Sequence, residues 1–189
     1  MNKPVELIIT DPMEPQIDPE KASTAIALRF IRDARDTPFL KVMLAQTAVL
    51  FPCAAFLFAR FSWWMAPAYW VLVFAVFLPP YTLMLHSTSH RKLFRKEFDW
   101  LNRYIPYALG PLMGQSPGTY FAHHMGMHHP ENNLERDLSS TMPYQRDSFF
   151  EFLRYYGRFM ARGAFDLVSY FHRTNRPRLA RQVVLGEVS

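Results

Sequence analysis

Apolar and charged residues are distributed unevenly along the chain, and two long uncharged runs dominate its first half. Residues 42–59 and residues 61–85 contain no charged side chain, and Arg60 alone separates them. A helix needs about 20 apolar residues to cross a hydrocarbon core about 30 Å thick. The pattern therefore predicts two membrane-spanning helices, near residues 40–60 and 64–85.

The link between the two predicted spans is short, so we expect them to form a helical hairpin. The alternative is a pair of buried helices in a soluble core, but a domain of this size rarely surrounds two apolar helices on every side. Of the 21 Lys and Arg residues, all except Arg60 flank the two runs, which predicts that both termini are cytoplasmic. Aromatic residues suited to the membrane interface gather at the start of the second span: Trp63, Trp64, Tyr69 and Trp70.

Charged and apolar residues alternate with a helical period on either side of the hairpin. Near the N-terminus, Asp18 and Pro19 suit the start of one such helix. After the hairpin, Ser148 and Glu151 form a capping-box pattern at the start of a helix over residues 147–172. Each helix has an apolar side and a charged side. This fits a solvated face on a globular protein or a helix lying on a membrane surface.

The remaining segments are not expected to cross a membrane. Residues 104–122 are apolar, but six prolines and glycines interrupt them, so we expect this segment at the interface or buried in protein. Residues 1–20 are acidic and rich in proline, which predicts a flexible tail without a signal peptide. The expected fold class is an all-α membrane protein, in which a transmembrane helical hairpin is joined to cytoplasmic or interfacial amphipathic helices.

The composition favours a membrane protein over other classes. Hydrophobic residues make up 50% of the chain, 17 residues are phenylalanine, and the formal net charge is +5. The basic residues interleave with aromatic residues, which a membrane explains better than nucleic acid does. The single cysteine, Cys53, cannot form an intrachain disulfide, and we expect it to be a small buried hydrophobic residue.

Six of the seven histidines fall in two short clusters after the second span. His86 and His90 form the first cluster and are four residues apart. On a helix that continues the span, both rings project from one face about one turn apart, which is a metal-chelating spacing. The seventh histidine, His172, stands alone, and we expect it to be an ordinary polar side chain.

The second cluster contains His123, His124, His128 and His129. His124 and His128 repeat the spacing of four residues. His129 points about 100° away from His128 on a regular helix, so the two adjacent rings are placed to serve two different metals. Pro130 disfavours helical geometry at the residue before it, so we expect the helix to end at His129.

The residue types narrow the choice of metal. Neutral imidazole is a ligand for iron, zinc and copper alike. Neither cluster contains the glutamate of a zinc-protease motif, and no cysteine lies near to complete a structural zinc site. Six imidazoles exceed the number that one metal commonly uses. Two metals, which we expect to be iron, are the simplest interpretation of the two clusters.

The order of the clusters, HSTSH and then HHMGMHHPENN, resembles the histidine boxes of the integral-membrane fatty acid desaturase superfamily. The resemblance implies a di-iron centre on the cytoplasmic side of a membrane, such as the bacterial inner membrane. It also implies use of O2, electrons from a ferredoxin or cytochrome type donor, and insertion of a double bond into a lipid acyl chain. The implied metal ligands are His86 and His90 in the first box and His124, His128 and His129 in the second, with His123 beside it.

The family carries a third histidine box, which this sequence lacks. We therefore expect residues 21–189 to form a desaturase-like membrane domain that is truncated, or that a C-terminal half or an oligomer partner completes. Two alternatives stay open. One is a lipid or carotenoid hydroxylase or ketolase of the same superfamily, and the other is a non-catalytic membrane fragment that binds metal.

Acidic residues near the clusters are either hydrogen-bond acceptors for the histidine rings or plain solvated acids. They are Asp99, Glu131, Glu135 and Asp137. Arg136 and the basic residues near it suit an acidic acyl carrier or anionic lipid headgroups, and we favour the lipid.

Overall fold

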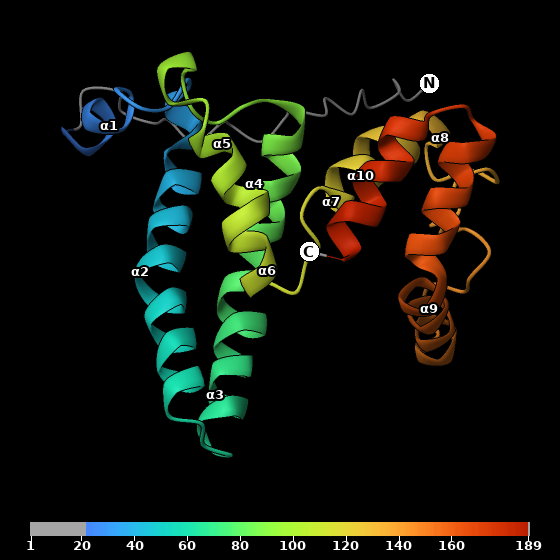
Figure 1. Cartoon of the computed structure of the whole chain (residues 1–189), viewed down its shortest axis with the longest axis horizontal. Coiled ribbons are helices and arrows are strands. Elements are labelled where there is room, and N and C mark those ends of the chain that lie inside the picture. The colour runs from blue at the N-terminus through green and yellow to red at the C-terminus, as the bar shows by residue number, and fades with distance from the viewer. Residues whose placement is uncertain (1–21, 189) are drawn as a thin grey trace, which may run out of the picture.

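The structure is a computed structural model that describes residues 22–188, and Figure 1 shows its arrangement. A helical hairpin is formed by α2 and by a continuous helix made of α3, the π-helical segment η2, and α4. Beside it stands a second group of helices, α7 to α10. The predicted tail and the predicted cap at Asp18 lie outside the described residues. The hairpin elements are α2 (Thr37–Ala59), α3 (Met65–Val71), η2 (Leu72–Phe77) and α4 (Leu78–His90).

Both hairpin helices are long and apolar enough to cross a membrane. They cover Ala34–Ala59 and Met65–His90, with 26 residues each. These bounds agree with the predicted spans near residues 40–60 and 64–85. The second helix also runs on through the first histidine cluster, as the spacing predicted. Cys53 is half-buried on α2 rather than fully buried.

Proline shapes three widened π turns in the described chain. Each turn ends two residues before a proline: η2 before Pro79, η4 before Pro111 and η5 before Pro130. In an α-helix the proline ring clashes with the carbonyl group four residues earlier. In each π turn, the residue before the proline donates its backbone N–H to the carbonyl five residues earlier, as His129 does to His124. The widened turn therefore carries the helix through the proline.

The segment after the hairpin packs back against it. η4 lies against α2, and Ile105 and Leu109 are buried. The Tyr81 hydroxyl donates a hydrogen bond to the Ile105 carbonyl oxygen at 3.2 Å. This part of the proline-broken segment is thus buried in protein, one of the two positions expected for it. The small elements here are α1 (Ala22–Ala27), η1 (Ala34–Asp36), η3 (Lys96–Phe98), α5 (Leu101–Tyr104), η4 (Ile105–Leu109) and α6 (Gly110–Leu112).

Two loops at the histidine end of the hairpin are joined to each other. An antiparallel bridge connects Ile31 with Phe94, and it is the one isolated β-type contact in the part of the chain that the structure describes. Arg91 also forms an ion pair with the nearly buried Asp36 carboxylate, at 2.6 Å. These contacts fix the end of α4, which carries the first histidine cluster, relative to the start of α2.

The second group of helices has a small core of its own, in which Phe171 and Val183 are fully buried. The backbone at Gly126 comes so close to Phe171 that a Cβ atom at Gly126 would lie 2.8 Å from the ring. Ser148 accepts a hydrogen bond from the Glu151 N–H, which confirms the predicted N-cap. The elements are α7 (Thr119–His123), η5 (His124–His128), α8 (His129–Glu131), α9 (Phe149–Arg173) and α10 (Pro177–Glu187).

Candidate metal centre

The two histidine clusters meet where the end of α4 packs against η5. His86, His90 and His124 each offer a ring nitrogen within 4.8 Å of the others, which is close enough to hold a metal ion. The His86 ring lies edge-on to that of His124, with ring centres 4.5 Å apart. The fold thus brings together residues of both clusters, as the sequence predicted.

His129 completes a tighter arrangement with two of these residues. The Nε2 atoms of His90, His124 and His129 form a triangle with sides of 3.1 to 3.2 Å. Imidazole nitrogens bind transition metals at about 2.0–2.1 Å, so two ligand nitrogens with this separation subtend roughly 95–106° at a shared ion. That angle lies between octahedral and tetrahedral values. The three nitrogens therefore fit three adjacent positions around one metal ion.

The π turn decides which rings share this triangle. On a regular α-helix, residues five apart point about 140° away from each other. In η5 the wider turn brings His129 next to His124 instead, with 3.1 Å between their Nε2 atoms. The ring centres of His128 and His129 lie 5.9 Å apart, and the expectation that these two rings serve different metals stays a prediction. The helix continues to Glu131, so the expected end at His129 is wrong.

The proline that widens the turn also leaves one carbonyl without its usual helical donor. Pro130 has no N–H, and the group four residues earlier is the Gly126 carbonyl. The Arg176 guanidinium donates to this oxygen at 2.7 Å. A side chain from the loop before α10 therefore supports the π turn.

The triangle has one buried corner and two exposed corners. His124 is buried, whereas His90 and His129 are exposed, as is the neighbouring His86. Burial, followed by the nearby histidines, lowers the pKa of His124 to about 4. The neutral imidazole is the form that binds a metal. The buried corner is thus held in its ligand form at neutral pH.

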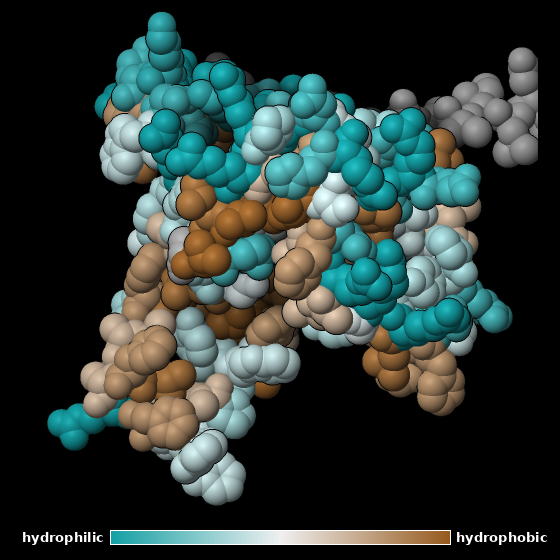
Figure 2. Space-filling view, turned by 45° about the vertical axis from the view of Figure 1, so that its right-hand side comes forward, coloured by the Kyte–Doolittle hydropathy of each residue, from teal (hydrophilic) through white to brown (hydrophobic). Residues whose placement is uncertain are grey.

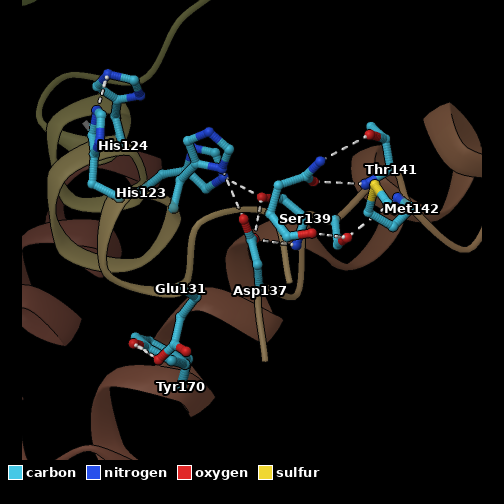
Figure 3. Close-up of polar contacts among 12 residues, drawn as sticks. His123, His124, Glu131, Asp137, Ser139, Thr141, Met142 and Tyr170 are labelled. Atoms are coloured by element: carbon cyan, nitrogen blue, oxygen red, sulfur yellow. Dashed lines mark hydrogen bonds and ion pairs between the residues drawn. The ribbon is translucent and has the colours of Figure 1, made fainter. Parts of the chain in front are cut away.

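Asp137 fixes the orientation of His128. The Asp137 Oδ2 atom lies 2.7 Å from His128 Nδ1, and Figure 3 shows the loop that carries it. Burial by itself raises the pKa of Asp137, but hydrogen bonds from Ser139 and His128 outweigh this, so the pKa lies below its usual value. A carboxylate that accepts the Nδ1 hydrogen leaves the Nε2 lone pair of the ring available for a metal.

His123 stands apart from the triangle. Its Nε2 atom lies 2.8 Å from the Ser139 hydroxyl, and its ring stacks on that of His128, with centres 6.0 Å apart. Ser139 in turn donates both its N–H and its hydroxyl hydrogen to Asp137. Burial lowers the pKa of His123. Ser139 was not among the residues predicted from the sequence, although a serine two residues after an aspartate is a common local hydrogen-bonding pattern.

The four acidic residues near the clusters have different partners. Asp137 bonds to a histidine ring, which is one of the two roles considered for the group. Glu131 instead accepts a hydrogen bond from the Tyr170 hydroxyl at 2.6 Å, and Arg136 lies 3.5 Å from it. Figure 3 shows this contact on the side of the helix away from His123 and His124. Asp99 pairs with Lys92 and bonds to Asn102, and Glu135 is exposed.

The described residues thus contain a histidine group that fits a metal ion, with a second, carboxylate-anchored histidine beside it. Imidazole alone does not determine the metal, since it suits iron, zinc and copper. The comparisons supply no further identification, because no protein-family model, no curated protein and no solved structure matches this chain.

Proposed function

We propose that this chain is the metal-binding part of a membrane-embedded, O2-dependent oxidoreductase of the fatty acid desaturase type. The observation that carries the proposal is the triangle of Nε2 atoms from His90, His124 and His129 at the end of an apolar hairpin. Its donors come from both histidine clusters that resemble the desaturase boxes. The metal is iron, and the substrate is a lipid acyl chain.

Two groups of residues would hold iron. His90, His124 and His129 are placed for one ion, with His86 beside them. His128, held by Asp137, is placed to donate its free nitrogen to a second. Iron supplies the oxidising power for breaking a strong aliphatic C–H bond, which side chains alone lack. Burial of His124 excludes water from one side, and Asp137 keeps His128 in a single tautomer.

The location in a membrane rests on the hairpin. In the most apolar stretch of the first and second helix, only 22% and 28% of the stretch is buried within the protein. Core helices of soluble proteins are mostly buried. Because basic residues favour the cytoplasmic side, we infer that both ends of the hairpin lie in the cytoplasm and that the membrane is a bacterial inner membrane. His86 and His90 then lie at the membrane edge, where a lipid tail has access. Labelling of Ser89→Cys from outside intact cells would contradict this orientation.

Two alternative functions share the same site. A lipid hydroxylase or ketolase would use the same ligands on a similar substrate. A non-catalytic metal-binding hairpin is favoured by the exposure of His86, His90 and His129, which leaves the site open on one side. In the desaturase proposal, a C-terminal half or an oligomer partner covers this side. A ferredoxin or cytochrome type donor then delivers electrons.

Iron binding tests the proposal directly. The chain is purified in detergent without oxygen, loaded with Fe(II), and its metal content is measured beside that of two variants. His124→Ala removes the buried corner of the triangle, and His172→Ala removes an exposed histidine on α9 as the matched control. Iron should be lost with His124→Ala and kept with His172→Ala. Equal iron in all three proteins would refute the site, and firmly bound zinc in its place would favour the non-catalytic alternative.

A further inference from the structure

An apolar stripe runs along the whole of α9, and its two halves have different surroundings. The C-terminal half of the stripe is buried against η5 and α10, where it forms the second core. The N-terminal half is exposed, with Phe149 67% and Met160 65% accessible. The residues of the stripe are Phe149, Phe152, Leu153, Tyr156 and Met160 in the exposed half and Leu167, Tyr170 and Phe171 in the buried half.

The opposite side of the exposed half is in contact with the protein. The Arg158 guanidinium donates to the Leu138 carbonyl oxygen at 3.0 Å, and the Tyr155 hydroxyl donates to the Ser139 carbonyl oxygen at 3.3 Å. One face of α9 therefore holds the loop that carries Asp137 and Ser139. The other face presents a row of aromatic and aliphatic side chains that no part of residues 22–188 covers.

We propose that the N-terminal half of α9, Phe149–Met160, lies in the surface of a lipid bilayer with its apolar stripe inserted. The proposal rests on the membrane location of the hairpin that is proposed above. Exposed aromatic and aliphatic residues flanked by arginines are the composition of helices that lie in the interface. Arg154 and Arg162 lie on the polar side of the helix with side chains that are 75% and 71% accessible, and their long apolar stems let the guanidinium groups reach lipid phosphates.

The orientation of α9 agrees with contact between its apolar stripe and a bilayer. Figure 1 shows the first turns of α9 nearly end-on, whereas α2 is seen from the side, so this part of α9 runs across the axis of the hairpin. Figure 2 shows apolar atoms along the lower edge of the second group of helices, on the side toward which the hairpin points. In Figure 1 these turns lie level with the part of the hairpin between α6 and α3, so a bilayer that contains the hairpin also contacts the stripe. Contact with lipid on one face of α9 then steadies the Asp137 loop on the other.

Fluorescence quenching in the full chain tests the proposal. Cys53→Ala removes the single native cysteine, and one cysteine is then placed at Met160 or at Arg162 and labelled with an environment-sensitive dye. The two positions are similarly exposed and lie on different faces of α9. A third label at Val76, which is exposed in the middle of the second span, reports whether the hairpin is inserted. The proteins are reconstituted into phosphatidylcholine and phosphatidylglycerol vesicles.

The two quenchers distinguish lipid, water and a polypeptide partner as the contact of the apolar stripe. Spin-labelled lipid should quench the dye at Met160. Aqueous iodide should quench the Met160 dye at least about threefold less than it quenches the Arg162 dye, because the stripe is expected to insert by about 5–10 Å. Equal quenching by iodide at both positions, with the Val76 dye quenched by lipid, would overturn the proposal. Protection of Met160 from both quenchers would also overturn it and would indicate a polypeptide partner. If spin-labelled lipid does not quench the Val76 dye, the hairpin is not inserted, and the proposed membrane location is itself refuted.

Discussion

The Nε2 atoms of His124 and His129 lie 3.1 Å apart, although the two residues are five positions apart on one continuous helix. A regular α-helix would separate their directions by about 140°. The π turn that precedes Pro130 removes this separation and makes the two rings neighbours. π turns are often found at functional sites, and here the turn determines the ligand geometry directly.

Pro130→Ala tests whether the proline maintains this π turn. Without the ring, the helix can return to α geometry, which would turn His129 away from His124 and remove a corner of the triangle. Iron affinity should fall by about tenfold or more, a loss of at least about 1.4 kcal/mol. Titration of the anaerobic protein with Fe(II) measures this. Pro111→Ala is the matched control, because Pro111 follows an equivalent π turn away from the histidines and should leave iron affinity unchanged.

The anchoring of His128 is tested by Asp137→Asn. An amide in place of the carboxylate weakens the bond to Nδ1 and frees the ring to change tautomer and orientation. Loss of such a partner typically costs 10- to 100-fold in metal affinity, roughly the decrease we expect for the second iron. The first iron should bind as before. Glu135→Gln, at an exposed position two residues earlier, should change neither, and a similar loss from both substitutions would argue against an orienting role for Asp137.

The close packing at Gly126 predicts a difference between two glycine substitutions. A methyl group at Gly126 would meet Phe171 at 2.8 Å and Leu179 at 3.0 Å, so Gly126→Ala should destabilise the fold by about 1–3 kcal/mol. At Gly157 a Cβ atom meets nothing within 4 Å. Gly157→Ala should therefore be neutral or stabilise α9 by up to about 1 kcal/mol. Thermal unfolding in detergent compares the two, and equal melting temperatures would contradict the packing.

The activity of the chain by itself is predicted to be undetectable. His86, His90 and His129 are exposed, so nothing in the described residues places an acyl methylene in a dry position near the metals. Fatty-acid methyl ester profiles of cells that express the 189 residues should show no new double bonds. Fusion to a C-terminal half with a third histidine box should produce them, and His124→Ala should abolish them. New double bonds from the 189-residue chain alone would disprove this prediction.

Several features were readable from the sequence, because each depends on local composition or on short spacings. Two uncharged runs of sufficient length determined the hairpin helices, and the spacing of four residues placed His86 and His90 on one face of the second. The Ser148 cap was equally local. The clustering of six histidines also indicated a metal site, because imidazole is a common metal ligand, and His86, His90 and His124 do lie close enough to hold an ion.

The tertiary structure decided how the rings are paired. A proline after His129 is compatible with the end of a helix or with a π turn, and the sequence favoured the end. The turn is stabilised by distant groups, the Arg176 guanidinium on the Gly126 carbonyl and the Phe171 ring against Gly126. The choice of Asp137 over its acidic neighbours depends in the same way on the loop that α9 holds. The proline makes the π turn possible, and long-range packing selects it over a helix end.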